Sequence, residues 1–127
     1  MTVPGFLLRK LYKRGSLLET ADGHFAFRLQ NPLATATLIG PPTFVINGIH
    51  YEGSDIGSDD VSLADISPEA PFKFQKGTEI ELTFPGRLLR GGNRIHMTVD
   101  TTEFDEIEFL VEDREATYCE LPIGEEE

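Results

Sequence analysis

The 127-residue chain, 39% of it apolar, is long enough for one domain with its own hydrophobic core. Its formal net charge of −11 argues against a nucleic-acid-binding protein, which normally carries a basic balance and a basic or aromatic stripe. The single cysteine, Cys119, excludes an internal disulfide, and the N-terminal stretch has too few consecutive apolar residues for a signal peptide or a membrane span. We therefore expect a cytoplasmic protein that makes no contact with membranes.

Alternation of apolar and polar residues with a period of two, which is typical of strands, runs through most of the chain. In chain order it predicts a weak strand at residues 7–12, a clear one at 24–30, a weak one at 34–39, a hairpin over 43–52, a weak strand at 60–66, and clear strands at 78–84, 94–99 and 106–111. The hairpin rests on Asn47 and Gly48, which lie between two apolar runs and suit a two-residue turn with positive φ at both positions.

Eight or nine short strands, each with one apolar face, are best buried as two sheets packed face to face. We therefore predict an all-β, two-sheet antiparallel β-sandwich of immunoglobulin-like or jelly-roll style, with a barrel as the alternative. One domain is expected over residues 1–122. Twelve of the 22 acidic residues lie after residue 99, and residues 123–127 are expected to form an acidic, disordered tail.

The stretch from Gly86 to Asp100 concentrates glycine and positive charge, which raises the question of a phosphate-binding loop. Such loops lie between a strand and a helix, whereas this one runs directly into an alternating, strand-like segment. We interpret it as a structural turn, in which Leu88 or Leu89 closes the core and Gly91 and Gly92 make a tight return. The side chains of Arg87, Arg90 and Arg94 then form a positive patch that could dock an acidic partner surface or a sugar.

The sequence predicts no catalytic residue and no bound metal or cofactor in this chain. His24, His50 and His96 lack metal-site spacing, and His96 is expected to point away from the core. Acidic residues between 55 and 65 lack the calcium-loop pattern and are interpreted as a turn, with calcium binding left open: Asp55, Asp59, Asp60 and Asp65. No nucleophile motif is present, and Cys119 has no cationic neighbour in the sequence to lower its pKa.

Four segments in order resemble the small β subunit of bacterial C-glycoside deglycosidases. They are the strand-Asn47-Gly48-strand hairpin, the aromatic segment with Phe72 and Phe74, the strand "GTEIEL" and the turn "LLRG" before an alternating strand. The resemblance covers about two-thirds of the 127 residues. It implies a non-catalytic accessory subunit within a lyase complex. The partner would be a larger sugar-isomerase-like barrel, which holds the divalent metal and cleaves the C–C glycosidic bond.

Within such a hetero-oligomer, we expect the partner interface at an exposed aromatic segment and at the arginine-bearing turn, because aromatic and arginine side chains dominate interface energetics: Phe72, Phe74, Arg87, Arg90 and Arg94. Two other functions stay open. A self-associating interaction domain would pair through an unpaired edge strand. A carbohydrate-binding module would need exposed aromatic rings, for which the chain offers three tyrosines and no tryptophan.

Overall fold

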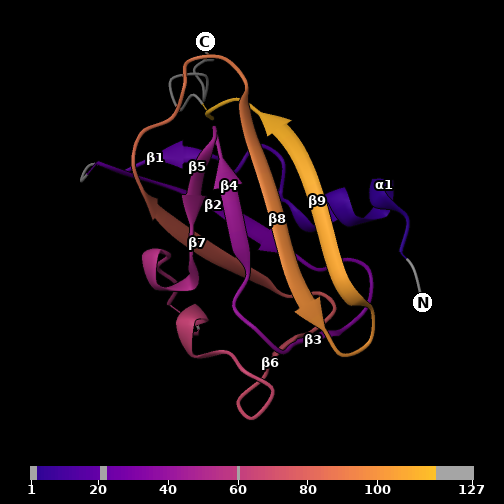
Figure 1. Cartoon of the computed structure of the whole chain (residues 1–127). Coiled ribbons are helices and arrows are strands. Elements are labelled where there is room, and N and C mark those ends of the chain that lie inside the picture. Colours follow the sequence, from indigo (N-terminus) through magenta and orange to yellow (C-terminus); the bar gives the residue numbers. More distant parts are fainter. Residues whose placement is uncertain (1–2, 21–22, 60, 117–127) are drawn as a thin grey trace.

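Two antiparallel β-sheets of unequal size pack face to face (Figure 1). The structure is a computed structural model that describes residues 3–20, 23–59 and 61–116. The smaller sheet has the order β1 (Leu18–Glu19), β2 (His24–Gln30) and β7 (Glu79–Pro85). The larger one has the order β5 (Ile49–Tyr51), β4 (Thr43–Ile46), β8 (Asn93–Thr101), β3 (Ala36–Leu38) and β6 (Phe72–Phe74), with β9 (Asp105–Asp113) on the other side of β8. The predicted all-β sandwich is confirmed.

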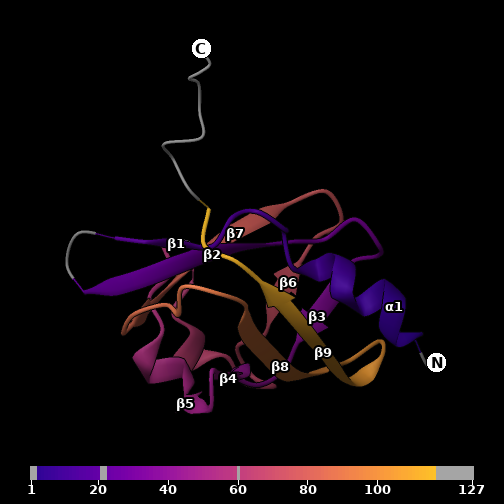
Figure 2. The same cartoon turned by 90° about the horizontal axis from the view of Figure 1, so that it is seen from above.

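Short helical segments cover the open sides of the sandwich. The α-helix α1 (Gly5–Leu8) continues into the 3₁₀ turn η1 (Arg9–Leu11), and both lie beside β9 (Figure 2). Two further 3₁₀ turns, η2 (Gly53–Asp55) and η3 (Leu63–Asp65), contact each other after β5. No helix in the described ranges has the length and apolar character needed to cross a bilayer.

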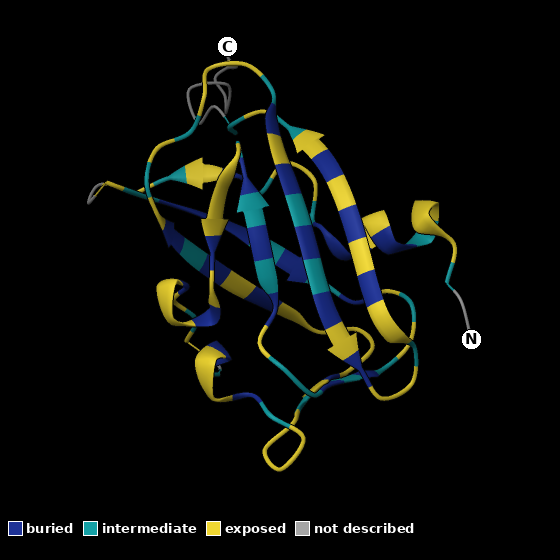
Figure 3. Ribbon diagram, in the orientation of Figure 1, coloured by how far each residue is buried: buried dark blue, intermediate teal, exposed yellow. Residues whose placement is uncertain are grey.

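The alternation read from the sequence matches the burial of the long strands (Figure 3). On β8, Ile95, Met97 and Val99 are buried, and they lie opposite inward-facing residues of β9. His96 lies between them in sequence and points outward, where its Nε2 contacts Glu108 Oε2 at 2.5 Å, so its predicted orientation is confirmed. One face of each long strand therefore forms the core.

Aromatic rings fill one half of that core. The ring of Phe84 on β7, which is fully buried, lies 5.3 Å from Phe25 and 5.0 Å from Phe27, both in the smaller sheet. It also lies 5.2 Å from Phe44 and 5.3 Å from Tyr51, both in the larger sheet. Phe84 therefore joins the two sheets, in the offset and edge-to-face arrangements that aromatic pairs prefer.

The prediction of strands at residues 7–12 and 60–66 is wrong. Residues 7–12 form the end of α1 and η1, because Leu7, Leu8 and Leu11 follow helical spacing and bury one face of a helix. In the second segment Leu63 and Ile66 are buried three residues apart, which is the repeat of a 3₁₀ turn. Residue 60 lies outside the described residues.

The predicted hairpin is confirmed, since β4 and β5 pair and the turn residues Asn47 and Gly48 have φ of 53° and 83°. The tight return at Gly91 and Gly92 is wrong, because β7 and β8 belong to different sheets and residues 86–92 carry the chain across between them. Neither of these two glycines has a positive φ; Gly86 does, at 128°. A two-residue return is a feature of strands paired in one sheet, which β7 and β8 are not.

Replacing Phe84 with alanine should lower the free energy of unfolding by about 3–5 kcal/mol, because it removes ring contacts to both sheets and leaves a cavity. Urea denaturation would measure the loss. Phe6→Ala is the control, since the Phe6 side chain is 62% exposed and should change stability by less than about 0.5 kcal/mol. Equal effects of the two substitutions would contradict the role given to Phe84.

Candidate functional site

The arginine turn, defined as residues 86–94, crosses one end of the sandwich (Figure 1). It begins at Gly86, where the φ of 128° favours glycine and where a Cβ would come within 3.1 Å of Tyr51 Oη. Tyr51 Oη itself donates a 2.8 Å hydrogen bond to the carbonyl of Pro85. Strand β8 begins within the turn, at Asn93, so the turn lacks the helix N-terminus on which phosphate loops depend.

A buried asparagine holds this turn in place. Asn93 is 0% exposed, and its Oδ1 accepts hydrogen bonds from Leu89 N at 2.7 Å and Asn47 Nδ2 at 2.8 Å. Its Nδ2 donates to the carbonyls of Leu89 and Gly91, each at 3.2 Å. The amide is thereby satisfied at both ends, as a buried polar group must be.

The same network ties the turn to two neighbouring segments. Asn47 Oδ1 accepts the Arg94 N–H at 3.0 Å, so the hairpin and the arginine turn share reciprocal amide contacts. Glu19 of β1 accepts the Leu88 N–H at 2.8 Å, and its second oxygen lies 3.8 Å from Arg87 Nη1. The two stretches singled out from the sequence as turns are therefore parts of one structure.

The side chains that this network displays are charged or apolar. Arg87, Arg90 and Arg94 are exposed, together with Leu89 at 54% and Ile49 of the hairpin at 55%. We call these five residues the turn surface. Of the two leucines expected to close the core, Leu88 packs against it and Leu89 points outward. The structure thus brings the three predicted arginines onto one end of the molecule.

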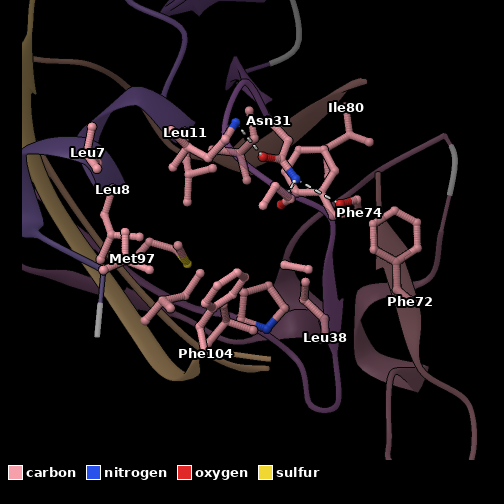
Figure 4. Close-up of a pocket in the computed structure, with 18 of the residues that line it drawn as sticks. Leu7, Leu8, Leu11, Asn31, Leu38, Phe72, Phe74, Ile80, Met97 and Phe104 are labelled. Carbon is pink, nitrogen blue, oxygen red and sulfur yellow. Dashed lines mark hydrogen bonds between the residues drawn. The ribbon is translucent and has the colours of Figure 1, made fainter. Parts of the chain in front are cut away.

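Phe72 and Phe74 lie away from the turn surface, at the other end of the larger sheet, on β6. Phe74 is buried and Phe72 is half-buried, so the expectation of an exposed aromatic segment is wrong. Both rings line an apolar cavity of about 290 Å³ (Figure 4). Their assignment to a partner interface stays a prediction, and their observed position makes them walls of the cavity.

The histidines and acidic residues considered as metal ligands do not form a common site in the described residues. His50 contacts Glu52 at 2.5 Å, as His96 does Glu108, and within the described ranges no three His, Cys, Asp or Glu residues gather as metal ligands would. In the acidic loop, Asp55 Oδ2 accepts the Glu52 N–H at 2.9 Å and so caps η2, which supports the interpretation as a turn. Asp60, Cys119 and the predicted tail lie outside the described residues.

No sequence motif predicted the hydrogen bonds between the N-terminal segment and Asp113. Tyr12 Oη donates a 2.7 Å hydrogen bond to Asp113 Oδ2, which also accepts the Gly15 N–H at 2.9 Å. Burial raises the pKa of the Asp113 carboxyl, but these two donors and the Arg114 N–H outweigh it and hold that pKa below its usual value. Burial and the Asp113 carboxylate raise the pKa of Tyr12. The pair fastens the N-terminal segment to β9.

Exposed acids elsewhere have shifted pKa values for ordinary structural reasons. Hydrogen bonds from Arg28 and Lys13 lower the pKa of Glu79. Hydrogen bonds from the backbone and the hydroxyl of Thr37 lower that of Glu103. In each case the partner belongs to a neighbouring strand or loop, so these shifts reflect contacts that hold segments together.

Replacing Asn93 with alanine should destabilise the fold by about 1–3 kcal/mol, because the partly buried Leu89 N–H and the Asn47 amide lose their acceptor. Hydrogen exchange at the Leu89 amide should become faster, which would show that the turn itself has loosened. Gln75→Ala, at an exposed amide, is the control and should be nearly neutral. An unchanged Leu89 amide would show that Asn93 does not hold the turn.

Replacing Asp113 with asparagine should lower the free energy of unfolding at pH 7 by about 1.5–3 kcal/mol, since hydrogen bonds to a charged group are lost. The folded-state pKa lies below the usual 3.8, so this contribution is present above pH 3.8 and is lost as the pH falls through the folded-state pKa. The stability difference between wild type and variant should therefore shrink below pH 3.8. Glu106→Gln, on the same strand but exposed, should show no comparable difference; a pH-independent Asp113→Asn effect would refute the charge argument.

Comparison with known proteins corrects the resemblance drawn from the sequence. No curated protein matches the chain. A family model described as "Hydroxymethylglutaryl-CoA reductase, N-terminal domain" matches residues 7–115. The resemblance to the C-glycoside deglycosidase β subunit is therefore wrong, and the barrel-type partner and lyase chemistry inferred from it lose their support. The motifs behind it were turns and core strands, which unrelated sandwiches share. The match spans most of the chain, so the chain belongs to the hydroxymethylglutaryl-CoA reductase N-terminal domain family.

Proposed function

We propose that this chain is a non-catalytic accessory domain that docks, through the turn surface, onto the catalytic part of a hydroxymethylglutaryl-CoA reductase. The observation that carries the proposal is the turn surface itself. Three exposed arginines and the exposed side chain of Leu89 lie on one short segment, on a chain whose net charge is −11. Arginine is enriched at interfaces and their hot spots, and burial of an exposed apolar side chain favours association.

The hydrogen bonds beneath the turn surface favour binding. Asn93 fixes the backbone at Leu89 and Gly91, Asn47 fixes it at Arg94, and Glu19 fixes it at Leu88, before any partner arrives. A preorganised loop loses little conformational entropy on association, so more of the contact energy appears as affinity. The turn therefore suits recognition better than a loose loop of the same composition.

The charge of the turn surface sets the chemistry of the partner. Arginine pairs with carboxylates in a two-pronged geometry, so we expect an acidic patch with a small apolar depression for Leu89. The family description supports the choice of partner, because it names the N-terminal domain of a hydroxymethylglutaryl-CoA reductase.

Changing Arg87, Arg90 and Arg94 to glutamate together should weaken binding to the separately expressed catalytic part by about a hundredfold or more, through like-charge repulsion. Isothermal titration calorimetry of the two purified proteins would measure the dissociation constant. Raising the salt concentration should weaken the wild-type complex and affect the triple variant less.

The matched control is the triple variant Lys10→Glu, Lys73→Glu and Lys76→Glu, which makes the same change in net charge at exposed sites away from the turn surface. It should bind nearly as well as wild type. If both triple variants lose binding equally, net charge and not the turn surface is responsible. If wild type does not bind the catalytic part and its mass rises with concentration, the chain is instead the self-associating domain considered above.

A further inference from the structure

The apolar cavity lies in the half of the core that the aromatic rings leave unfilled. It is bounded by both sheets and closed on one side by Leu7, Leu8 and Leu11 of α1 and η1 (Figure 4). None of the rings that contact Phe84 takes part in its lining. Other rings, those of Phe72, Phe74 and Phe104, line the cavity, but they leave the space between the two sheets unfilled at this end.

The cavity offers water no partner. Asn31 is the one polar side chain among the described residues that line it. Its Nδ2 donates 2.8 Å hydrogen bonds to the carbonyls of Ala34 and Phe74, and its Oδ1 accepts the Leu33 N–H at 3.1 Å. Because water needs two or more polar partners to occupy a buried site, this cavity is suited to an apolar occupant or to none.

The volume limits the size of that occupant. An engineered cavity of about 150 Å³ lined by aliphatic and aromatic side chains stays dry and binds benzene. The cavity here, at about 290 Å³, is larger by roughly a factor of two. We propose that it is a binding site for one uncharged, apolar molecule of about ten carbon atoms, a use that is independent of docking at the turn surface.

The N-terminal segment is the part of the wall that can open at least cost. Helix α1 has four residues and no side-chain cap, and a helix so short has little stability of its own. It is anchored at its far end, where Tyr12 bonds to Asp113 and pairs with Leu29 of β2. Outward movement of residues 5–11 about Tyr12 would therefore expose the cavity without unpairing either sheet.

The test uses n-butylbenzene, an uncharged ten-carbon probe, added to the ¹⁵N-labelled chain. Chemical-shift changes should cluster at the cavity lining, with Ala36 and Val99 among them, and hydrogen exchange of residues 5–11 should slow on binding. Decanoate, a ten-carbon acid, should bind at least tenfold more weakly, because its carboxylate finds no partner inside. No shift changes at the lining, or equal affinity for decanoate, would overturn the proposal.

A substitution that fills the cavity should weaken the binding of n-butylbenzene. Val99→Phe places a ring in the space and should weaken binding at least tenfold, whereas Val45→Phe makes the same change on the outer face of the larger sheet and should leave it unaffected. If Val99→Phe does not fold, Ala36→Val adds less volume at another lining position and should still weaken binding. Undiminished binding to the folded filled variant, or equal loss in Val45→Phe, would place the probe elsewhere and refute the assignment.

Discussion

The unequal size of the two sheets is the constraint on which the rest of this structure depends. A three-stranded sheet cannot cover the inner face of a six-stranded one, so other segments must bury what remains. Where the strands face each other, Phe84 and its neighbours fill the gap with rings. Beyond them, α1, η1 and η3 cover the larger sheet, and the residues they contribute are leucines too small to fill the space. The cavity is a consequence of that covering.

The sandwich also requires the chain to pass from one sheet to the other, and it does so at the arginine turn. Strands β7 and β8 are consecutive in sequence but lie in different sheets, so no ladder of hydrogen bonds holds the residues between them. Asn93 takes that role, since its amide satisfies Leu89, Gly91 and the hairpin residue Asn47. A segment that would otherwise be a loose crossover becomes an ordered surface.

Period-two alternation predicted the long strands because each has one buried face, and the Asn47-Gly48 pair predicted the hairpin because positive φ at both positions restricts the sequence. Residues 7–12 were misread because apolar positions 7, 8, 11 and 12 fit both a short strand and a helical turn. The network of Asn93 and the cavity had no local signal. Each depends on residues brought together from distant parts of the chain, such as Asn47 with Asn93 and Leu11 with Val99.

Strand β8 connects the two proposed sites, with Asn93 under the turn surface and Val99 at the cavity, about 20 Å apart at roughly 3.3 Å per residue. Between them lies the cluster around Phe84, whose Tyr51 contacts the arginine turn through Pro85. Coupling over such a distance needs an element with two arrangements. The buried rings that pack against both sheets have a single close-packed arrangement. Docking and ligand binding should therefore act independently. The close-packed rings around Phe84 should therefore keep movements of α1 and η1 over the cavity from disturbing the turn surface that a partner recognises.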